Sequence, residues 1–220
     1  MKHLNQLLLD FDYEQNFTDD DFYVGKSNFY PFELMNNWPN WEKNFLNISG
    51  EKFSGKTHLA NIFLKKFNGI KIESNLLNNE NLKTIKSYQN IVLENLKLNV
   101  NEDLIYSLFN IIDQDNKFLL ITSTKPVSEI NFNLEDLKSR TKNCLLAKIE
   151  NPDDELMFAL ILKNLSDKQI TLDKKLIDFI IKRIERSYSK IFEFIYKIDK
   201  ISLKKKKSID FKIINEALEK

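Results

Sequence analysis

The sequence predicts an α/β domain with a five-stranded parallel sheet covered by helices, followed by a small all-α domain. Three observations support this fold class. Short apolar runs alternate with helical patterns up to about residue 150, a glycine-containing loop of defined spacing joins the first run to a helix, and only helical patterns follow. Near-continuous apolar strands separated by helices are typical of a parallel sheet covered on both faces.

Five apolar runs are predicted as strands, and helical patterns lie between them. The strands are expected at 45–48, 69–73, 90–95, 117–123 and 143–149, and the helices at 57–64, 76–87, 104–112 and 134–140. At 151–155 a cap, a proline at the first helical position and acids in the first turn predict a new helical domain. We therefore expect domains at 13–150 and 151–220.

The second domain is predicted to hold four helices, at 156–165, 172–184, 187–201 and 210–218. A run of four lysines at 204–207 is expected between the last two of them. This run is read as a solvated turn, and contact with a phosphate backbone is the alternative.

The loop after the first strand carries the clearest chemical signal. Its sequence is Gly50-Glu51-Lys52-Phe53-Ser54-Gly55-Lys56-Thr57, which fits G-x-x-x-x-G-K-[ST] at every fixed position. In this pattern the glycines let backbone N–H groups face the phosphates of a nucleotide, the lysine adds a positive charge, and the threonine hydroxyl holds Mg²⁺. The following helix directs its positive N-terminus at the anion. An ordinary glycine-containing turn is the alternative.

Two strand ends are candidates for further chemistry. Glu94 ends the strand at 90–95, where a carboxylate can bind the Mg²⁺ shell through water. Thr124 follows the strand at 117–123 and could bring a hydroxyl near the terminal phosphate. Each residue taken alone is also a common strand-end residue. His3 and His58 lack ligand partners at metal spacing, so no metal site beyond Mg²⁺ is expected.

Composition excludes several classes of protein. A net charge of +1 argues against a general polyanion binder, and 4 glycines with 4 prolines leave little room for linkers. The single cysteine, Cys144, cannot form an internal disulfide, which suits a reducing cytoplasm. The longest apolar run, 156–162, is too short to span a bilayer, and the N-terminus has no signal-peptide pattern. We therefore expect a cytoplasmic protein without a membrane partner.

Five segments, taken in order along the chain, resemble the AAA+ ATPase domain of the DnaA family of bacterial replication initiators. Within this family they resemble the small Hda-like regulators. The resemblance covers nearly the whole chain. Segments 17–28, 55–59, 121–126, 134–140 and 182–186 are similar to the family's leading segment, phosphate loop, sensor-1 strand, arginine-finger segment and sensor-2 helix pair. The helical domain corresponds to the family's lid.

The resemblance implies roles for particular residues. Bound ADP or ATP would have its adenine bordered by Val24 and Gly25 and its phosphates held by the loop at 50–57 with His58. Thr57 would bind Mg²⁺ directly, and Glu94 would bind it through water. Arg186, in the helix pair that carries the family's sensor-2 arginine, would lie near the nucleotide. Arg140 would be an arginine finger that acts on another subunit's nucleotide.

The departures from the family pattern concern hydrolysis. The family usually has Asp where this chain has Glu94 and a second acid where it has Asn95, and Asn cannot act as a general base. Thr124 replaces a common Asp, and the sensor-2 position aligns with Ser189, nearly one helical turn after Arg186. These differences predict a protein that holds nucleotide well and hydrolyses it poorly alone.

The first residues resemble a peptide that docks into the bacterial sliding clamp. Gln6-Leu7-Leu8-Leu9-Asp10-Phe11 is similar to the motif Q-L-x-L-x-[LF], and we expect residues 1–12 to form this clamp-binding peptide. Gln6 would hydrogen-bond at the mouth of an apolar groove in the clamp, with Leu7 beside it, and Leu9 and Phe11 would fill the pockets of the groove. An amphipathic element packed on the domain is the alternative.

The function implied by the resemblance is a clamp-tethered regulator that promotes hydrolysis of DnaA-bound ATP and so limits replication initiation. It would meet the sliding clamp and DnaA, and it would meet DNA mainly through the clamp. The alternatives are a helicase-loader ATPase, a self-contained P-loop enzyme such as a small-molecule kinase, and an adaptor that uses nucleotide for stability. A homo-oligomer stays open as well.

The clamp peptide gives a direct prediction. Replacing Gln6 and Leu9 together with Ala should abolish capture of the protein by immobilised sliding clamp, because such peptides bind through a few pocket-filling anchors. The matched control is Gln15→Ala, which should leave capture unchanged. Removing residues 1–11 should leave the thermal unfolding transition intact; loss of folding with clamp binding retained would contradict the prediction.

Overall fold

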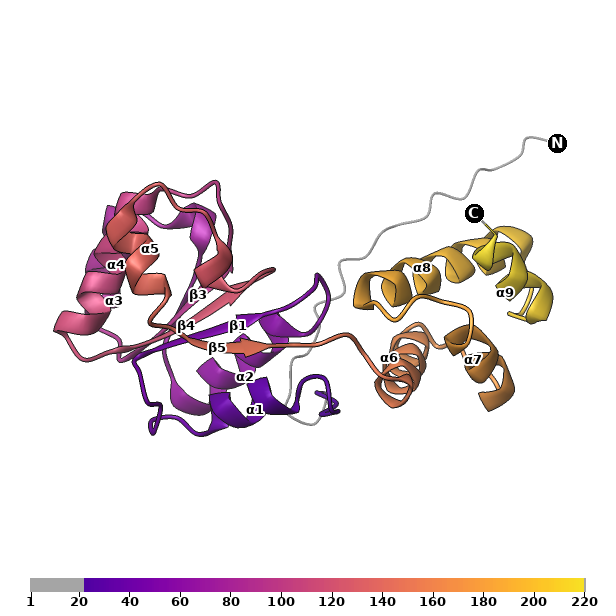
Figure 1. Cartoon of the computed structure of the whole chain (residues 1–220). Coiled ribbons are helices and arrows are strands. Elements are labelled where there is room, and N and C mark those ends of the chain that lie inside the picture. The colour runs from indigo at the N-terminus through magenta and orange to yellow at the C-terminus, as the bar shows by residue number, and fades with distance from the viewer. Residues whose placement is uncertain (1–21, 220) are drawn as a thin grey trace.

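In the computed structural model, which describes residues 22–219, five parallel strands form one sheet in the order β2-β3-β4-β1-β5 (Figure 1). The strands are β1 (Phe45–Ser49), β2 (Ile70–Glu73), β3 (Asn90–Leu96), β4 (Phe118–Ser123) and β5 (Leu145–Lys148). All five predicted strands are confirmed, each within a few residues of its expected bounds. Parallel pairing brings all five carboxyl ends to one edge of the sheet, where ligands bind in α/β folds.

Helices lie between the strands and continue after them. Those of the α/β part are α1 (Phe29–Asn36), α2 (Lys56–Phe67), α3 (Asn79–Ile85), α4 (Glu102–Gln114) and α5 (Glu135–Thr141), with short 3₁₀ helices η2 (Ser74–Leu76) and η3 (Val127–Glu129). The helical domain, called the lid below, consists of α6 (Asp154–Asp167), α7 (Lys174–Ile181), α8 (Tyr188–Lys205) and α9 (Phe211–Leu218). The predicted boundary near residue 150 falls between β5 and α6.

Several helical features differ from the sequence expectation. The proline expected at the first helical position is wrong, because Asp153 caps α6 and Pro152 precedes this cap. The single helix predicted at 76–87 is divided, because Asn78 forms a capping box with Asn81 and so starts α3 afresh. Helix α1 was not predicted from its mixed pattern. The four lysines do not all lie between helices: α8 runs through Lys205, which pairs with Glu216 of α9, and Lys206 ends the helix in the left-handed conformation.

The sheet is covered on both faces. On one face α3, α4 and α5 pack against the strands, with Ile85, Phe109 and Leu137 completely buried. On the other face lie α1 and α2 (Figure 1). Their residues Met35 and Phe63 are also completely buried. This double burial explains why the strands read as continuous apolar runs in the sequence.

The lid has its own apolar core, built from all four of its helices. Two buried lid residues, Leu156 of α6 and Tyr188 of α8, pack instead into the core beneath α1 and α2. The Tyr188 hydroxyl donates to the Glu150 carbonyl at 3.2 Å and lies 3.3 Å from the Ser27 hydroxyl. The first turn of α8 is therefore anchored in the α/β domain.

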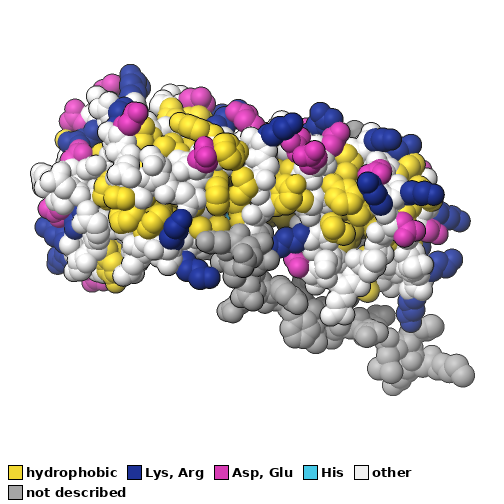
Figure 2. Space-filling model, turned by 90° about the horizontal axis from the view of Figure 1, so that it is seen from below, with side chains coloured by type: hydrophobic (Ala, Val, Ile, Leu, Met, Phe, Trp, Pro, Cys, Tyr) yellow, Lys and Arg dark blue, Asp and Glu magenta, His cyan; other side chains and the backbone are white. Residues whose placement is uncertain are grey.

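Charged side chains of both signs are interspersed over both domains on the face that Figure 2 shows, with hydrophobic side chains gathered between them. This mixture of signs agrees with the low net charge of the chain. Over residues 22–219, no helix combines the length and the apolar character that crossing a bilayer would require.

One polar residue lies in the middle of the buried sheet. Asn47 of β1 is fully buried, and its side-chain amide donates to the Ile121 carbonyl and the Ser123 hydroxyl of β4 at 3.1 and 2.9 Å. Its side-chain oxygen accepts from the Val127 N–H at 3.0 Å. Asn47 thus fixes the turn after β4 against the strand that precedes the phosphate loop.

Asn47→Ala should therefore lower the free energy of unfolding by about 2–4 kcal/mol, because it leaves several buried polar groups without partners. Urea denaturation of the whole chain measures this change. Asn215→Ala, at an exposed position of α9, is the matched control and should shift stability by less than about 0.5 kcal/mol. Equal effects of the two substitutions would contradict this account of Asn47.

Candidate functional site

The phosphate loop makes a sharp turn between β1 and α2. Gly55 has a φ of +92°, a conformation that side chains with a Cβ adopt only with strain, and it immediately precedes the first residue of α2. A Cβ at Gly50 would lie 2.8 Å from the Ser54 hydroxyl oxygen and 3.0 Å from Ile149. Both glycines of the motif are thus required by the geometry of the turn.

Lys56 turns its ammonium group back into this loop. Its Nζ donates to the Gly50 carbonyl at 2.9 Å and the Glu51 carbonyl at 2.6 Å, and it lies 3.4 Å from the Ser54 hydroxyl. Burial lowers the pKa of Lys56 to about 8, although the carboxylates of Glu51 and Glu94 act in the opposite direction. A buried ammonium held by carbonyl oxygens is a cation placed to receive phosphate oxygens.

Glu94 of β3 supplies a buried carboxylate near this lysine. Its side chain is 3% exposed, and one oxygen, Oε2, lies 3.4 Å from Lys71 Nζ. The other oxygen, Oε1, is buried and accepts no hydrogen bond from the residues that the structure describes. An orphaned carboxylate oxygen of this kind fits a water of a Mg²⁺ shell, so Glu94, together with the Thr57 hydroxyl at the start of α2, could hold the metal.

Thr124 lies at the end of β4 and is exposed. It lines a cavity of about 560 Å³ at the carboxyl ends of β2, β3 and β4, together with Glu73 and Asn95. The Asn95 side-chain amide donates to the Glu73 carboxylate at 3.2 Å, and its backbone N–H donates to the Thr122 hydroxyl at 2.9 Å. Asn95 therefore acts here as a hydrogen-bond donor.

The leading segment lies beside the loop. Phe22 approaches Gly55 so closely that a Cβ there would lie 3.0 Å from its ring, and the ring meets His58 edge-on at 5.2 Å. Gly25 is fixed by Asn28, whose side-chain oxygen accepts from the Gly25 N–H at 2.8 Å. The structure thus brings Phe22 to the phosphate loop, and the predicted contact of Val24 and Gly25 with adenine stays a prediction.

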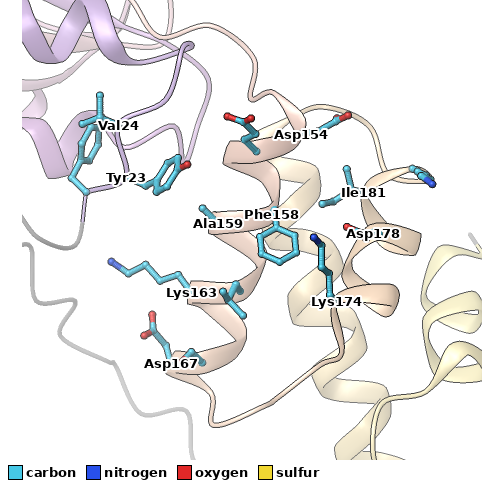
Figure 3. Close-up of a pocket in the computed structure, with 15 residues that line it drawn as sticks. Tyr23, Val24, Asp154, Phe158, Ala159, Lys163, Asp167, Lys174, Asp178 and Ile181 are labelled. Carbon is cyan, nitrogen blue, oxygen red and sulfur yellow. The ribbon is translucent and has the colours of Figure 1, made fainter.

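A wide cleft of about 1290 Å³ opens between this segment and the lid. Figure 3 shows Tyr23 and Val24 on one side of the cleft and Phe158 and Lys163 of α6 on the other. The cleft also includes Asp154 at the start of α6. The segment expected to border adenine is therefore open to solvent on its lid side.

The lid reaches the loop through the start of α8. Glu51 accepts hydrogen bonds from the Ser187 hydroxyl at 2.6 Å, the Tyr188 N–H at 2.9 Å and the Ser189 N–H at 3.2 Å. Burial by itself would raise the pKa of Glu51, but these hydrogen bonds together lower it. From the sequence alone, Glu51 is only one of the variable positions of the loop motif. A serine such as Ser187 before a helix is a local sign of a cap, and its side chain does cap α8. The hydrogen bond from Ser187 to Glu51, 136 residues away along the chain, has no such local sign.

Arg186 does not point into the loop. Its guanidinium pairs with Asp154 at 2.9 Å, and its side chain is 64% exposed. At the aligned sensor-2 position, Ser189 lies against the loop, with its hydroxyl 3.4 Å from the Lys52 carbonyl. Next to this contact the Phe53 ring stacks on Phe192 at 4.8 Å.

Comparison with known proteins connects this arrangement to DnaA. No protein-family model matches the chain. Over 198 residues it is 25% identical to an uncharacterized protein of Haemophilus influenzae, covering 84% of the chain and 86% of that protein. It is 27% identical to the chromosomal replication initiator protein DnaA of Thermoanaerobacter sp., covering 92% of the chain and 52% of DnaA.

Solved structures show a similar fold. Domain III of DnaA from Thermotoga maritima matches with a TM-score of 0.73 and 20% identity, covering 92% of this chain and 95% of that domain. The chain has the AAA+ fold of DnaA domain III. A mutant RuvB of Thermotoga maritima matches with a TM-score of 0.68, 15% identity, and coverage of 90% and 70%. The chain spans about half the length of the DnaA relatives that it matches.

Arg140 lies near the C-terminal end of α5 in this AAA+ domain and is 32% exposed. Its guanidinium forms an ion pair with Asp113 of α4 and lies 5.3 Å from the ring centre of Tyr106. The other end of α5 is fixed by Glu102, whose carboxylate accepts from the Asn133 and Leu134 N–H groups, and these bonds lower its pKa. Arg140 thus has partners inside its own domain.

The predicted clamp peptide, with Gln6, Leu7, Leu9 and Phe11, lies outside the described residues. The buried thiol of Cys144 has its pKa raised to about 12 by burial, so it is not a nucleophile of the site.

The lowered pKa of Lys56 predicts how the nucleotide-free protein responds to pH. The pKa is about 8 in the folded chain and near 10.5 when the chain is unfolded, so between these values the unfolded chain binds more protons. The Lys56 contribution to the free energy of unfolding therefore rises as the pH increases from 8 towards 10.5. Burial raises the pKa of Tyr188 and Cys144 and gives a contribution of opposite sign in the alkaline range.

The measurement is denaturant unfolding at pH 7 to 10 of the wild type and Lys56→Met. Subtracting the two curves removes the contributions of Tyr188 and Cys144, and the remainder should increase with pH above 8. Lys52→Met, at an exposed position of the same loop, is the control and should follow the wild type. A difference that stays flat across this range would contradict the burial of the Lys56 ammonium.

Proposed function

We propose that this protein is a nucleotide-binding, DnaA-related AAA+ regulator of replication initiation that acts on ATP-bound DnaA. The observation that carries the proposal is the phosphate loop with its buried lysine, near which β3 places the buried Glu94 carboxylate with one oxygen, Oε1, that accepts no hydrogen bond, in a chain similar to DnaA. In this proposal the nucleotide stabilises the chain itself, and catalysis takes place on the ATP of DnaA.

The nucleotide is proposed to be ADP or ATP with Mg²⁺. DnaA of Aquifex aeolicus, bound to AMPPCP, is among the solved structures with a similar fold, which supports an adenine nucleotide in the same place. Lys56 would exchange the Gly50 and Glu51 carbonyls for phosphate oxygens. Thr57 would hold Mg²⁺ directly and Glu94 would hold it through water, and such a water would donate to the Glu94 oxygen that has no hydrogen bond.

Hydrolysis of this nucleotide by the protein alone is proposed to be weak. Asn95, which stands next to Glu94, donates its amide to Glu73 and offers no base to an attacking water. Arg186 is engaged with Asp154 away from the loop. The resident nucleotide would therefore act as a structural ligand that stabilises the folded chain by mass action.

The action on DnaA is proposed to come from Arg140. An arginine supplied in trans neutralises charge on the transferred phosphoryl group and accelerates hydrolysis by about 10³–10⁵. Before it could act, Arg140 would have to leave Asp113, which is half exposed and therefore easily solvated. The sliding clamp would tether the protein through Gln6, Leu7, Leu9 and Phe11, so that it meets DnaA on replicating DNA.

One observation favours a second candidate, a nucleotide-stabilised adaptor. Arg140 is already occupied by Asp113 and Tyr106, as a residue would be whose role is to brace α5 against α4. In that case the protein would bind its partners without contributing a catalytic group. The two candidates make opposite predictions for Arg140.

The deciding experiment is turnover of DnaA-bound ATP in the presence of clamp loaded on DNA. Arg140→Ala should reduce the stimulation to background while nucleotide and clamp binding persist, and Arg140→Lys should restore little of it, because an ammonium lacks the planar fork of guanidinium. The matched control is Lys138→Ala on the same helix, whose side chain pairs with Glu135. Full stimulation by Arg140→Ala would contradict the finger and favour the adaptor.

The substitution Asp113→Asn distinguishes the two candidate roles of Arg140, a structural contact between α5 and α4 (the brace) and an arginine finger. It removes the ion pair and keeps Arg140, so a finger should retain or increase its stimulation. A brace predicts that Asp113→Asn and Arg140→Ala lower thermal stability alike and that neither changes stimulation.

A further inference from the structure

The contact between the lid and the phosphate loop is concentrated on one residue. Glu51 is the second residue of the loop motif, and its carboxylate accepts from the Ser187 hydroxyl and from the N–H groups of Tyr188 and Ser189. The third N–H of the same helical turn, that of Lys190, bonds the Ser187 hydroxyl oxygen at 3.3 Å. The donors at the start of α8 are thus satisfied, mostly by Glu51.

Glu51 also holds the loop from inside. Its backbone carbonyl accepts the short hydrogen bond from Lys56 Nζ, and its carbonyl also accepts from the Ser54 N–H at 3.2 Å. Glu51 therefore connects the Lys56 ammonium, through its backbone carbonyl, to the start of α8, through its carboxylate. The negative charge of its side chain matches the partial positive charge of the α8 N-terminus.

Neighbouring contacts support the same attachment. The Ser189 hydroxyl donates to the Lys52 carbonyl, and Phe53 stacks on Phe192 one turn further along α8. Phe53 has a φ of +68°, an unusual conformation for an aromatic residue, which the stacking helps to hold. Three consecutive loop residues therefore contact the lid.

The described basic residues beside the start of α8, Arg186 and Lys190, are engaged in ion pairs with acidic residues of the lid. Within the described residues, Arg186 pairs with Asp154, and Lys190 pairs with Glu193 at 2.9 Å. The backbone donors that could bind a further phosphate oxygen are occupied by Glu51. The first turn of α8 is therefore bound to the loop itself, through Ser187, Tyr188 and Ser189.

We propose that Glu51 is a positioning residue that holds the lid against the phosphate loop with its own carboxylate, so that lid closure does not depend on the third phosphate of a bound nucleotide. This inference rests on the proposed function in one respect, namely that the loop binds nucleotide. It predicts that the protein holds nucleoside di- and triphosphates with similar affinity.

The first test measures amide hydrogen exchange at residues 187–190 in the nucleotide-free protein. Glu51→Ala should speed exchange there by about tenfold, because two N–H groups lose their acceptor, and Glu51→Gln should restore part of the protection through its remaining carbonyl oxygen. Glu193→Ala is the matched control on α8 and should leave residues 187–190 unchanged. Equal exchange in Glu51→Ala and wild type would overturn the inference.

The second test measures the dissociation constants of ADP and of a non-hydrolysable ATP analogue. The wild type should bind both within about threefold. Glu51→Ala frees the α8 N-terminus for an additional phosphate, so the ratio should shift towards the ATP analogue by about three- to thirtyfold. If Glu51 had a merely structural role, Glu51→Ala would weaken the binding of both ligands by the same factor, and that result would overturn the inference. Absence of binding by the wild type would instead contradict the proposed function, and the exchange experiment would still decide the role of Glu51.

Discussion

The site depends on the ammonium of Lys56, which is buried between β1 and α2 and held by two backbone carbonyls of its own loop. Burying a charge costs free energy unless it is paired or hydrogen-bonded. Here the carbonyls of Gly50 and Glu51 solvate the ammonium, and their position in turn requires glycine at the two fixed positions of the motif. The conformation of the loop and the position of the Lys56 charge therefore depend on each other.

The other parts of the site are arranged around this loop by separate elements of the fold. β3 brings the Glu94 carboxylate, the leading segment brings Phe22 against Gly55, and α8 brings its first turn onto Glu51. Because each comes from a different segment, the site exists only when the sheet and the lid are assembled together. The Tyr188 ring, buried in the α/β core, fastens this assembly on the lid side.

The sequence was sufficient for much of this arrangement. Uninterrupted apolar runs predicted all five strands, and the spacing of two glycines and a lysine predicted the loop, because both patterns follow from local backbone requirements. Side-chain pairing between distant segments could not be read in this way. Nothing local in the sequence indicates that Glu51 meets Ser187, that Asp113 meets Arg140, or that Asn47 holds the turn at Val127.

A crystal structure with ADP and Mg²⁺ would test the central claim most directly. The account predicts that Lys56 Nζ leaves the carbonyls of Gly50 and Glu51 for phosphate oxygens, while the Glu51 carboxylate keeps its hydrogen bonds to the first turn of α8. Electron density for nucleotide elsewhere in the molecule, or a Lys56 still bound to the loop carbonyls beside an ADP, would contradict it.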